Sequence, residues 1–177
     1  MSLRPRSRPP RSSDAGLRLA LISDTHMPRG PRRIPDRAIE EIRGSDLLLH
    51  AGDISTEDVL AELESIGPPV RAVHGNVDSP ALVERLPEEL TVKVDGARIS
   101  MLHDAGPAKG RLERMRLRFP DSDTVVFGHS HQPLLEQSEG FQIFNPGSPT
   151  ERRRAPAHTM GIGEVQGGRI VLRHVEL

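Results

Sequence analysis

The sequence contains no cysteine, no tryptophan and no tyrosine, and its aromatic residues are four phenylalanines. Without cysteine the chain can form neither disulfides nor thiolate zinc sites, so oxygen and imidazole groups are the only strong metal ligands that it offers. With so few aromatic rings it also has little on which nucleic-acid bases could stack. We therefore do not expect it to bind single-stranded nucleic acid.

A charge excess of either sign and a long apolar run are also missing. Lysine and arginine number 24 and aspartate and glutamate 25, which gives a net charge of -1. No overall field therefore attracts nucleic acid or an anionic membrane, and no apolar run approaches the ~20 residues of a membrane helix. Residues 1–16 are basic and rich in proline and serine, but they lack the apolar centre of a signal peptide. We expect them to form a disordered tail on a cytoplasmic protein.

The rest of the chain, residues 17–177, has the length of a single domain with its own core. Its first half alternates near-continuous apolar runs with stretches whose apolar residues recur at helical spacing. Such alternation predicts a sheet that is covered by helices on its faces. The expected order is a strand at 17–23, a helix at 36–43, a strand at 47–53, a helix at 56–66 and a strand at 70–78.

The second half has turn signals between short apolar runs. Hairpin turns are expected at residues 95–96, 139–140 and 167–168, with a helix at 108–118 and a strand at 124–131. We expect this half to be largely antiparallel, in contrast to the parallel first half. Two packed sheets with helices outside would accommodate both halves, so the predicted fold class is α/β.

Side chains that can bind metal follow the predicted strands at the point where each strand ends. In α/β sheets ligands bind outside the carboxyl ends of the strands, so residues far apart in the sequence can converge there. Clustered carboxylates would repel one another unless a cation compensated, and imidazoles that bind a metal must be neutral. We therefore predict a site for two divalent metal ions. The residues at these strand ends are Asp24, His26, Asp53, Asn76, Asp78, His103, His129 and His131.

Each motif has an ordinary structural interpretation when it is taken alone. The Asp-x-His motif could be a turn, the Gly-Asp motif a cap and the Gly-Asn motif a turn, while His103 could be a plain surface or core histidine. The Gly-His-Ser-His segment at 128–131 is a stronger signal, because it brings two imidazoles to one loop. The presence of all five motifs, each after a predicted strand, favours the metal site.

The order D-x-H, G-D, G-N-x-D, H, G-H-x-H resembles the signature of the calcineurin-like metallophosphoesterase superfamily. The short chain, with Asn-Pro-Gly-Ser at 145–148 after the G-H-S-H segment, is similar to the small single-domain bacterial and archaeal phosphodiesterases of that superfamily. The resemblance covers residues 17–177. It implies a four-layer α/β/β/α sandwich, in which two mixed sheets pack together with helices outside.

The resemblance also implies how the ligands are shared. One ion would be held by Asp24, His26 and His131, and the other by Asn76, His103 and His129, with Asp53 bridging both. In such a site a hydroxide shared by the two ions attacks phosphorus in line. We expect Asp53 and Asn76 to take part in catalysis. Donors without sulfur suit Mn²⁺, Fe²⁺, Ni²⁺ or Zn²⁺, and the resemblance makes Mn²⁺ the first expectation.

Two positions depart from the pattern of many relatives. Val77 stands where many members carry a histidine that helps to protonate the leaving group, although the small subfamily also lacks it. A general acid contributes ~10²- to 10⁴-fold, so its absence should penalise poor leaving groups most. Asp104 follows His103 where relatives usually have glycine. Asp104 could cap the following turn, which we favour, or bind a ligand imidazole.

Other polar residues are candidates for supporting or substrate contacts. His50 could steady the Asp53 carboxylate, or it could be an ordinary strand histidine. His74 and Asp78 flank the Gly-Asn motif, and His74 could face the phosphate. Arg29 could decide which phosphoester enters. The arginines at 152–154 could attract oxyanions, although a solvated loop explains them as well.

These observations predict a metal-dependent phosphodiesterase that acts on a small phosphodiester. A phosphomonoesterase with the same site is one alternative. A second is a scaffold, since a retromer subunit shares this fold and works as a binding module. Because the predicted hairpins have edges that could pair with another copy, a homo-oligomer stays open.

Overall fold

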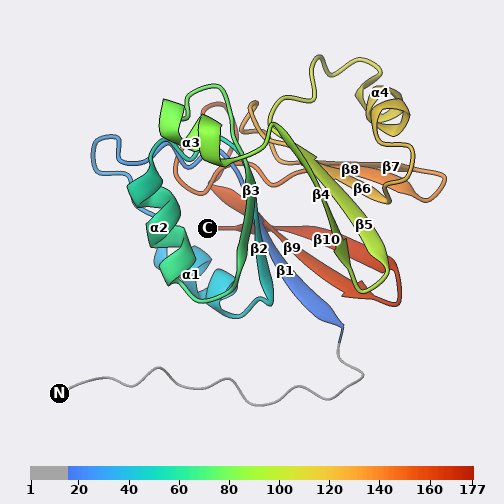
Figure 1. Cartoon of the computed structure of the whole chain (residues 1–177), viewed down its shortest axis with the longest axis horizontal. Coiled ribbons are helices and arrows are strands. Elements are labelled where there is room, and N and C mark those ends of the chain that lie inside the picture. Colours follow the sequence, from blue (N-terminus) through green and yellow to red (C-terminus); the bar gives the residue numbers. More distant parts are fainter. Residues whose placement is uncertain (1–15) are drawn as a thin grey trace.

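The computed structural model describes residues 16–177, which form two five-stranded sheets and the helices that cover them (Figure 1). The first sheet contains, in spatial order, β10 (Arg169–Glu176), β9 (Thr159–Gln166), β1 (Leu17–Ile22), β2 (Leu47–Ala51) and β3 (Val70–Val73). The second contains β4 (Glu89–Val94), β5 (Ala97–Leu102), β6 (Thr124–Val126), β8 (Phe141–Asn145) and β7 (Leu134–Ser138). The predicted tail at 1–16 lies outside the described residues, apart from Gly16.

Alternation along the strands of the first sheet divides its side chains between two layers. Ala20 and Ile22 of β1 pack with the helices on the outer face, whereas Leu19 and Leu21 point into the core between the sheets. Both sets are fully buried. A strand buried on both faces needs apolar residues at every position, which explains the near-continuous apolar run of β1.

The helices form the two outer layers. α1 (Asp36–Arg43), α2 (Glu57–Ser65) and α3 (Pro80–Arg85) lie on the outer side of the first sheet (Figure 1). On the far side, α4 (Arg111–Arg118) buries Met115 against the second sheet. The predicted four-layer α/β/β/α sandwich with two mixed sheets is therefore confirmed. None of the helices within residues 16–177 has the length and apolar character needed to cross a membrane.

The pairing of strands differs from the expected contrast between a parallel and an antiparallel half. The last hairpin, β9 with β10, joins the first sheet by running antiparallel to β1. In the second sheet β6 runs parallel to both β5 and β8. The three predicted hairpins, β4 with β5, β7 with β8 and β9 with β10, are antiparallel as expected. The parallel pairs of β6 were missed because turn signals identify hairpins, whereas β5 and β6 are joined through α4, and β7 stands between β6 and β8 in the chain.

The strands are also shorter than predicted, and one helix was missed. β2 ends at Ala51, β3 at Val73 and β6 at Val126, so the metal-binding motifs lie in loops beyond the strand ends. The helix α3 occupies a stretch to which the sequence pattern assigned no element. Ser79 caps it by accepting a hydrogen bond from the Leu82 N–H (3.3 Å), and Pro80 stands at its first position, where proline is favoured.

Candidate metal centre

The predicted ligands come together where strands of both sheets end. β1, β2 and β3 are parallel neighbours in the first sheet, and β5 and β6 are parallel neighbours in the second. Their carboxyl ends therefore lie at the same side of the molecule. In chain order, the loops after these strands carry Asp24 and His26, Asp53, Asn76 and Asp78, His103, and His129 and His131.

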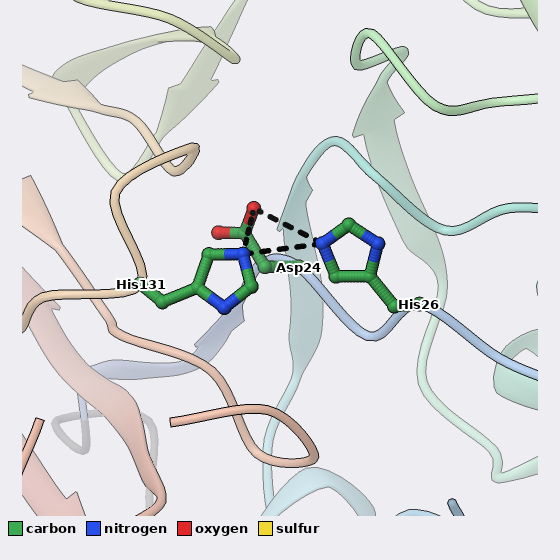
Figure 2. Close-up of side chains that lie close together, drawn as sticks. All are labelled: Asp24, His26 and His131. Carbon is green, nitrogen blue, oxygen red and sulfur yellow. Dashed lines mark hydrogen bonds and ion pairs between the residues drawn. The ribbon is translucent and has the colours of Figure 1, made fainter. Parts of the chain in front are cut away.

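The first group of donors consists of Asp24, His26 and His131 (Figure 2). Asp24 Oδ1 lies 3.3 Å from His131 Nε2 and 3.8 Å from His26 Nε2. The two Nε2 atoms are 3.1 Å apart. All three side chains are at most 4% exposed. Three donor atoms thus face one small buried volume, as the expected first ligand set requires.

The second group consists of Asn76, His103 and His129. Asn76 Oδ1 lies 3.2 Å from His103 Nε2 and 3.0 Å from His129 Nδ1. His103 is buried, whereas the His129 side chain is 47% exposed. The structure therefore brings the expected second set together as well, at a more open place.

Asp53 lies between the two groups. Its Oδ2 is 3.5 Å from His26 Nε2 and 3.2 Å from His103 Nε2, and its Oδ1 accepts a hydrogen bond from the Val77 N–H (3.0 Å). One carboxylate thus reaches an imidazole of each group, which is the placement that a bridging ligand needs. Asp24 Oδ1 also lies 4.0 Å from His103 Nε2, so the two groups adjoin each other.

Backbone carbonyls orient two of the imidazoles. His103 Nδ1 is 2.8 Å from the Ala51 carbonyl, and His131 Nδ1 is 2.5 Å from the Glu151 carbonyl. A carbonyl can only accept, so each Nδ1 carries a proton and donates. In the neutral ring the Nε2 lone pair then points into the site, where it can bind a metal.

The charges of the site are not balanced by basic side chains. In the described part of the chain, Asp24 and Asp53 form ion pairs with histidines alone. Burial raises the pKa of Asp53, but the hydrogen bond and charge of His103, with the Val77 N–H, lower it more strongly, to about 2. Burial lowers the pKa of His103, yet its hydrogen bond to Asp53 and the nearby carboxylates outweigh this and raise it. Two buried carboxylates whose ion-pair partners among the described residues are histidines alone would be compensated by bound cations, so the residues fit divalent metal ions.

Five of the seven predicted ligands have a left-handed backbone, which is uncommon outside glycine. A residue held in this region typically costs ~1–3 kcal/mol, and such residues cluster at functional sites. The loops therefore place the donors at a cost that the surrounding structure must offset. The φ values are 57° at Asp24, 45° at His26, 58° at Asp53, 66° at His129 and 59° at His131.

Asp78 braces the loops of the second group. Its carboxylate accepts hydrogen bonds from the N–H groups of Asp53 (3.1 Å), Ser55 (2.6 Å) and Gly75 (2.6 Å). Hydrogen bonds to a charged acceptor contribute ~1.5–3 kcal/mol each. Both oxygens of Asp78 therefore bind backbone N–H groups, and the side chain holds the loops around Asp53 and Gly75 in place.

Two glycines of the motifs are required by the close approach of a ligand. A Cβ at Gly75 would lie 2.1 Å from Asp53 Oδ1, and one at Gly128 would lie 2.7 Å from Asp24 Oδ2. Both distances are shorter than any real contact of a Cβ atom. The glycines that precede Asn76 and His129 thus let loops from different strands pack directly on the carboxylates.

The remaining sequence candidates take different places. His50 is fully buried, and its Nε2 lies 3.2 Å from Thr25 Oγ1, so the hydrogen-bond partner that the structure gives it is Thr25 and its support of the Asp53 carboxylate stays a prediction. Thr25 is the residue between Asp24 and His26, so His50 contacts the loop that carries these two ligands. Asp104 caps the following turn, as favoured, by accepting a hydrogen bond from the Gly106 N–H (2.7 Å).

A cavity of about 260 Å³ adjoins the second group. His74 lines it together with Asn76, His103 and His129, and Glu88 and Arg118 lie at its wall. His74 thus lines the cavity, and its expected contact with the phosphate stays a prediction. Arg29 is exposed on the loop after His26, where its expected role stays a prediction. Of the three arginines at 152–154, Arg153 donates to the His129 carbonyl (3.1 Å).

Sequence reasoning assigned no role to the segment after β8, although its Asn-Pro-Gly-Ser motif was a visible signal. Asn145 donates to the Gly128 carbonyl (2.8 Å), and Ser148 donates to the Asp24 carbonyl (2.8 Å). The segment therefore fastens the loops that carry both groups. Glu151 was missed entirely; its carboxylate lies 3.8 Å from His26 Nε2.

Comparisons with known proteins identify the family of the chain. The sequence pattern of the calcineurin-like phosphoesterase superfamily domain matches residues 17–168. The chain is 34% identical to a probable metallophosphoesterase of Methanothermobacter thermautotrophicus over 137 residues, which are 76% of this chain and 78% of that protein. It is 25% identical to a phosphodiesterase of Methanocaldococcus jannaschii over 146 residues, 74% of this chain and 83% of the relative.

A similar solved structure is vacuolar protein sorting 29 of Cryptosporidium parvum. It superposes with a TM-score of 0.76 and covers 93% of this chain and 99% of its own, at 22% identity. At that identity the likeness establishes the shared fold and leaves the activity open.

Proposed function

This chain belongs to the calcineurin-like phosphoesterase superfamily, and we propose that it is a metal-dependent phosphodiesterase that hydrolyses a small phosphodiester. One observation supports the proposal most strongly. Seven oxygen and nitrogen donors from five loops converge at one edge of the two sheets, and Asp53 reaches an imidazole of each group. The phosphodiesterase relative supports the same reaction class.

The two groups of donors would hold one ion each. Asp24, His26 and His131 form the first position, Asn76, His103 and His129 form the second, and Asp53 is shared. Two bound divalent ions lower the pKa of water and neutralise charge on phosphoryl oxygens. A donor set of oxygen and nitrogen without sulfur suits Mn²⁺, Fe²⁺, Ni²⁺ and Zn²⁺ alike. On the family resemblance we propose Mn²⁺ as the native metal, with the other three as alternatives.

The chain's own residues hold the donors ready. The Ala51 and Glu151 carbonyls keep the protons of His103 and His131 on Nδ1, so that both Nε2 atoms are free to bind. The substrate would enter through the cavity beside Asn76 and His129. Val77 stands where many relatives carry the histidine that helps to protonate the leaving group, so esters with good leaving groups should react fastest.

The test is hydrolysis of bis(p-nitrophenyl) phosphate and p-nitrophenyl phosphate by chelator-treated protein resupplied with Mn²⁺, Ni²⁺ or Zn²⁺. We expect turnover of the diester to exceed that of the monoester, and the Asp53→Asn variant to lose at least ~100-fold in activity. The reason is that even the partners of metal ligands typically account for ~10–100-fold. Undiminished activity in Asp53→Asn would refute the bridging role.

The same assay separates the alternatives. A phosphomonoesterase would prefer p-nitrophenyl phosphate. A scaffold of this fold would turn over neither compound with any metal, and that result would end the enzyme proposal. The buried carboxylates of Asp24 and Asp53 have only histidines as ion-pair partners among the described residues, and they favour the enzyme, because a scaffold has no physical need to assemble them.

A further inference from the structure

The two carboxylate oxygens of Glu151 differ in their partners. Its Oε1 is 2.8 Å from Arg32 Nη2, within a good ion pair. Its Oε2 is buried and, among the described residues, has no hydrogen-bond partner. That oxygen lies 3.8 Å from His26 Nε2, an atom of the first group. The unpartnered oxygen therefore faces the first ion position.

Such an arrangement is costly unless something completes it. A buried acceptor without a partner destabilises the fold, and more so when the group is charged. Arg32 compensates one carboxylate oxygen, while its other terminal nitrogen reaches the His26 carbonyl at 3.5 Å. The second oxygen is left for a partner on the side of His26.

The same residue is tied to all three members of the first group. Its carbonyl accepts the hydrogen bond from His131 Nδ1. Its N–H donates to Ser148 Oγ (2.8 Å), and that hydroxyl donates to the Asp24 carbonyl. A shift of Glu151 would therefore displace both an imidazole and the loop of Asp24. The backbone of Glu151 is thus held at the site by two hydrogen bonds, and Arg32 fixes its carboxylate.

We propose that Glu151 is a positioning residue for the first metal ion, with Oε2 as an outer anionic partner that Arg32 holds in place. Its oxygens stand outside the set of donor atoms that all come within 4.8 Å of one another, so contact through an intervening water fits better than direct binding. The inference rests on the proposed metal centre. It adds a carboxylate that none of the five sequence motifs contains.

Calorimetric titration of Mn²⁺ into metal-free protein tests this role without measuring activity. In Glu151→Gln we expect one of two binding steps to weaken ~10- to 100-fold, as for other outer partners of metal ligands, and the other step to stay unchanged. Glu64→Gln is the matched control, because Glu64 pairs with Arg85 at 3.0 Å on the exposed surface. Equal affinity of Glu151→Gln and wild type would overturn the proposal.

Thermal unfolding separates positioning of the ion from a purely structural ion pair. Positioning predicts that metal-free Glu151→Gln is at least as stable as metal-free wild type, and that Mn²⁺ raises its Tm less. A structural pair predicts the reverse, with lower metal-free stability and an unchanged rise. Glu151→Asp keeps the charge but withdraws the oxygen, so full affinity in that variant would also overturn the inference.

The outcomes remain distinct from those of the activity assay. If Mn²⁺ affinity falls in Glu151→Gln but wild type cleaves no ester, the Glu151 role stands and the phosphodiesterase proposal fails. If wild type cleaves the diester and Glu151→Gln binds Mn²⁺ normally, the phosphodiesterase proposal stands and the Glu151 role fails.

Discussion

The two groups of donors differ in how far they are closed to solvent. The first group is almost completely buried, whereas in the second the His129 side chain is 47% exposed and faces a cavity. Charges interact more strongly where water is excluded. The closed group should therefore retain its ion more tightly, and the open group should be the side on which substrate arrives.

Removing one imidazole from each group in turn should give the largest effects and should test the difference between the closed and the open group. We expect His131→Ala to weaken the tighter Mn²⁺ step by more than ~100-fold and to abolish most activity, because a buried ligand is lost. His129→Ala should weaken the other step by only ~10-fold, since water already competes at that open position. Calorimetry on metal-free protein gives both constants. Equal losses in the two variants would contradict the difference in closure.

The buried imidazole of His50 should make the stability of the protein depend on pH. Burial lowers the pKa of His50 from 6.5 to about 4. Between these values the unfolded chain binds the proton and the folded chain does not, so stability falls as the pH falls from 6.5 to 4. The contribution amounts to about 3 kcal/mol over that interval.

The matched variant is His50→Gln, which cannot titrate. Urea unfolding of metal-free protein at pH 7 and pH 4.5 should show a smaller loss of stability in His50→Gln than in wild type. Parallel losses in the two proteins would mean that His50 does not stay neutral in the fold.

The smallest expected effect concerns the loop that flanks the closed group. Arg29 is exposed there, and we expect Arg29→Ala to raise the KM for the diester about two- to fivefold, because exposed charge contacts contribute up to ~1 kcal/mol. Metal content should not change. Arg33→Ala, which removes another exposed arginine of the same loop, is the control. An equal KM in wild type, Arg29→Ala and Arg33→Ala would show that Arg29 has no role in substrate binding.

The predicted ligands illustrate what the sequence can reveal. Asp24 and His131 are separated by more than a hundred positions, yet both follow apolar runs that form strands. Because strand ends of parallel neighbours meet, the convergence of these residues could be predicted without knowledge of the strand order. The layered arrangement of sheets and helices could be predicted as well, because apolar strand patterns alternate with helical patterns along the chain.

The contacts that were missed depend on tertiary packing. Nothing in the local sequence indicates that His50 points at Thr25, because that contact requires the register between β1 and β2. Glu151 lies in an arginine-rich loop and reads as a solvated charge until Arg32 is placed beside it. The helix α3 is short, and its capping serine became meaningful only with the fold known.

The distance along the chain between the members of the first group has a consequence for the whole molecule. His26 and His131 are 105 residues apart, and they belong to loops of different sheets. An ion held by both closes a long loop, and such clips stabilise a fold by restricting its unfolded chain. In a protein without cysteine, the first ion position would thus serve as the reversible cross-link that fastens one half of the sandwich to the other.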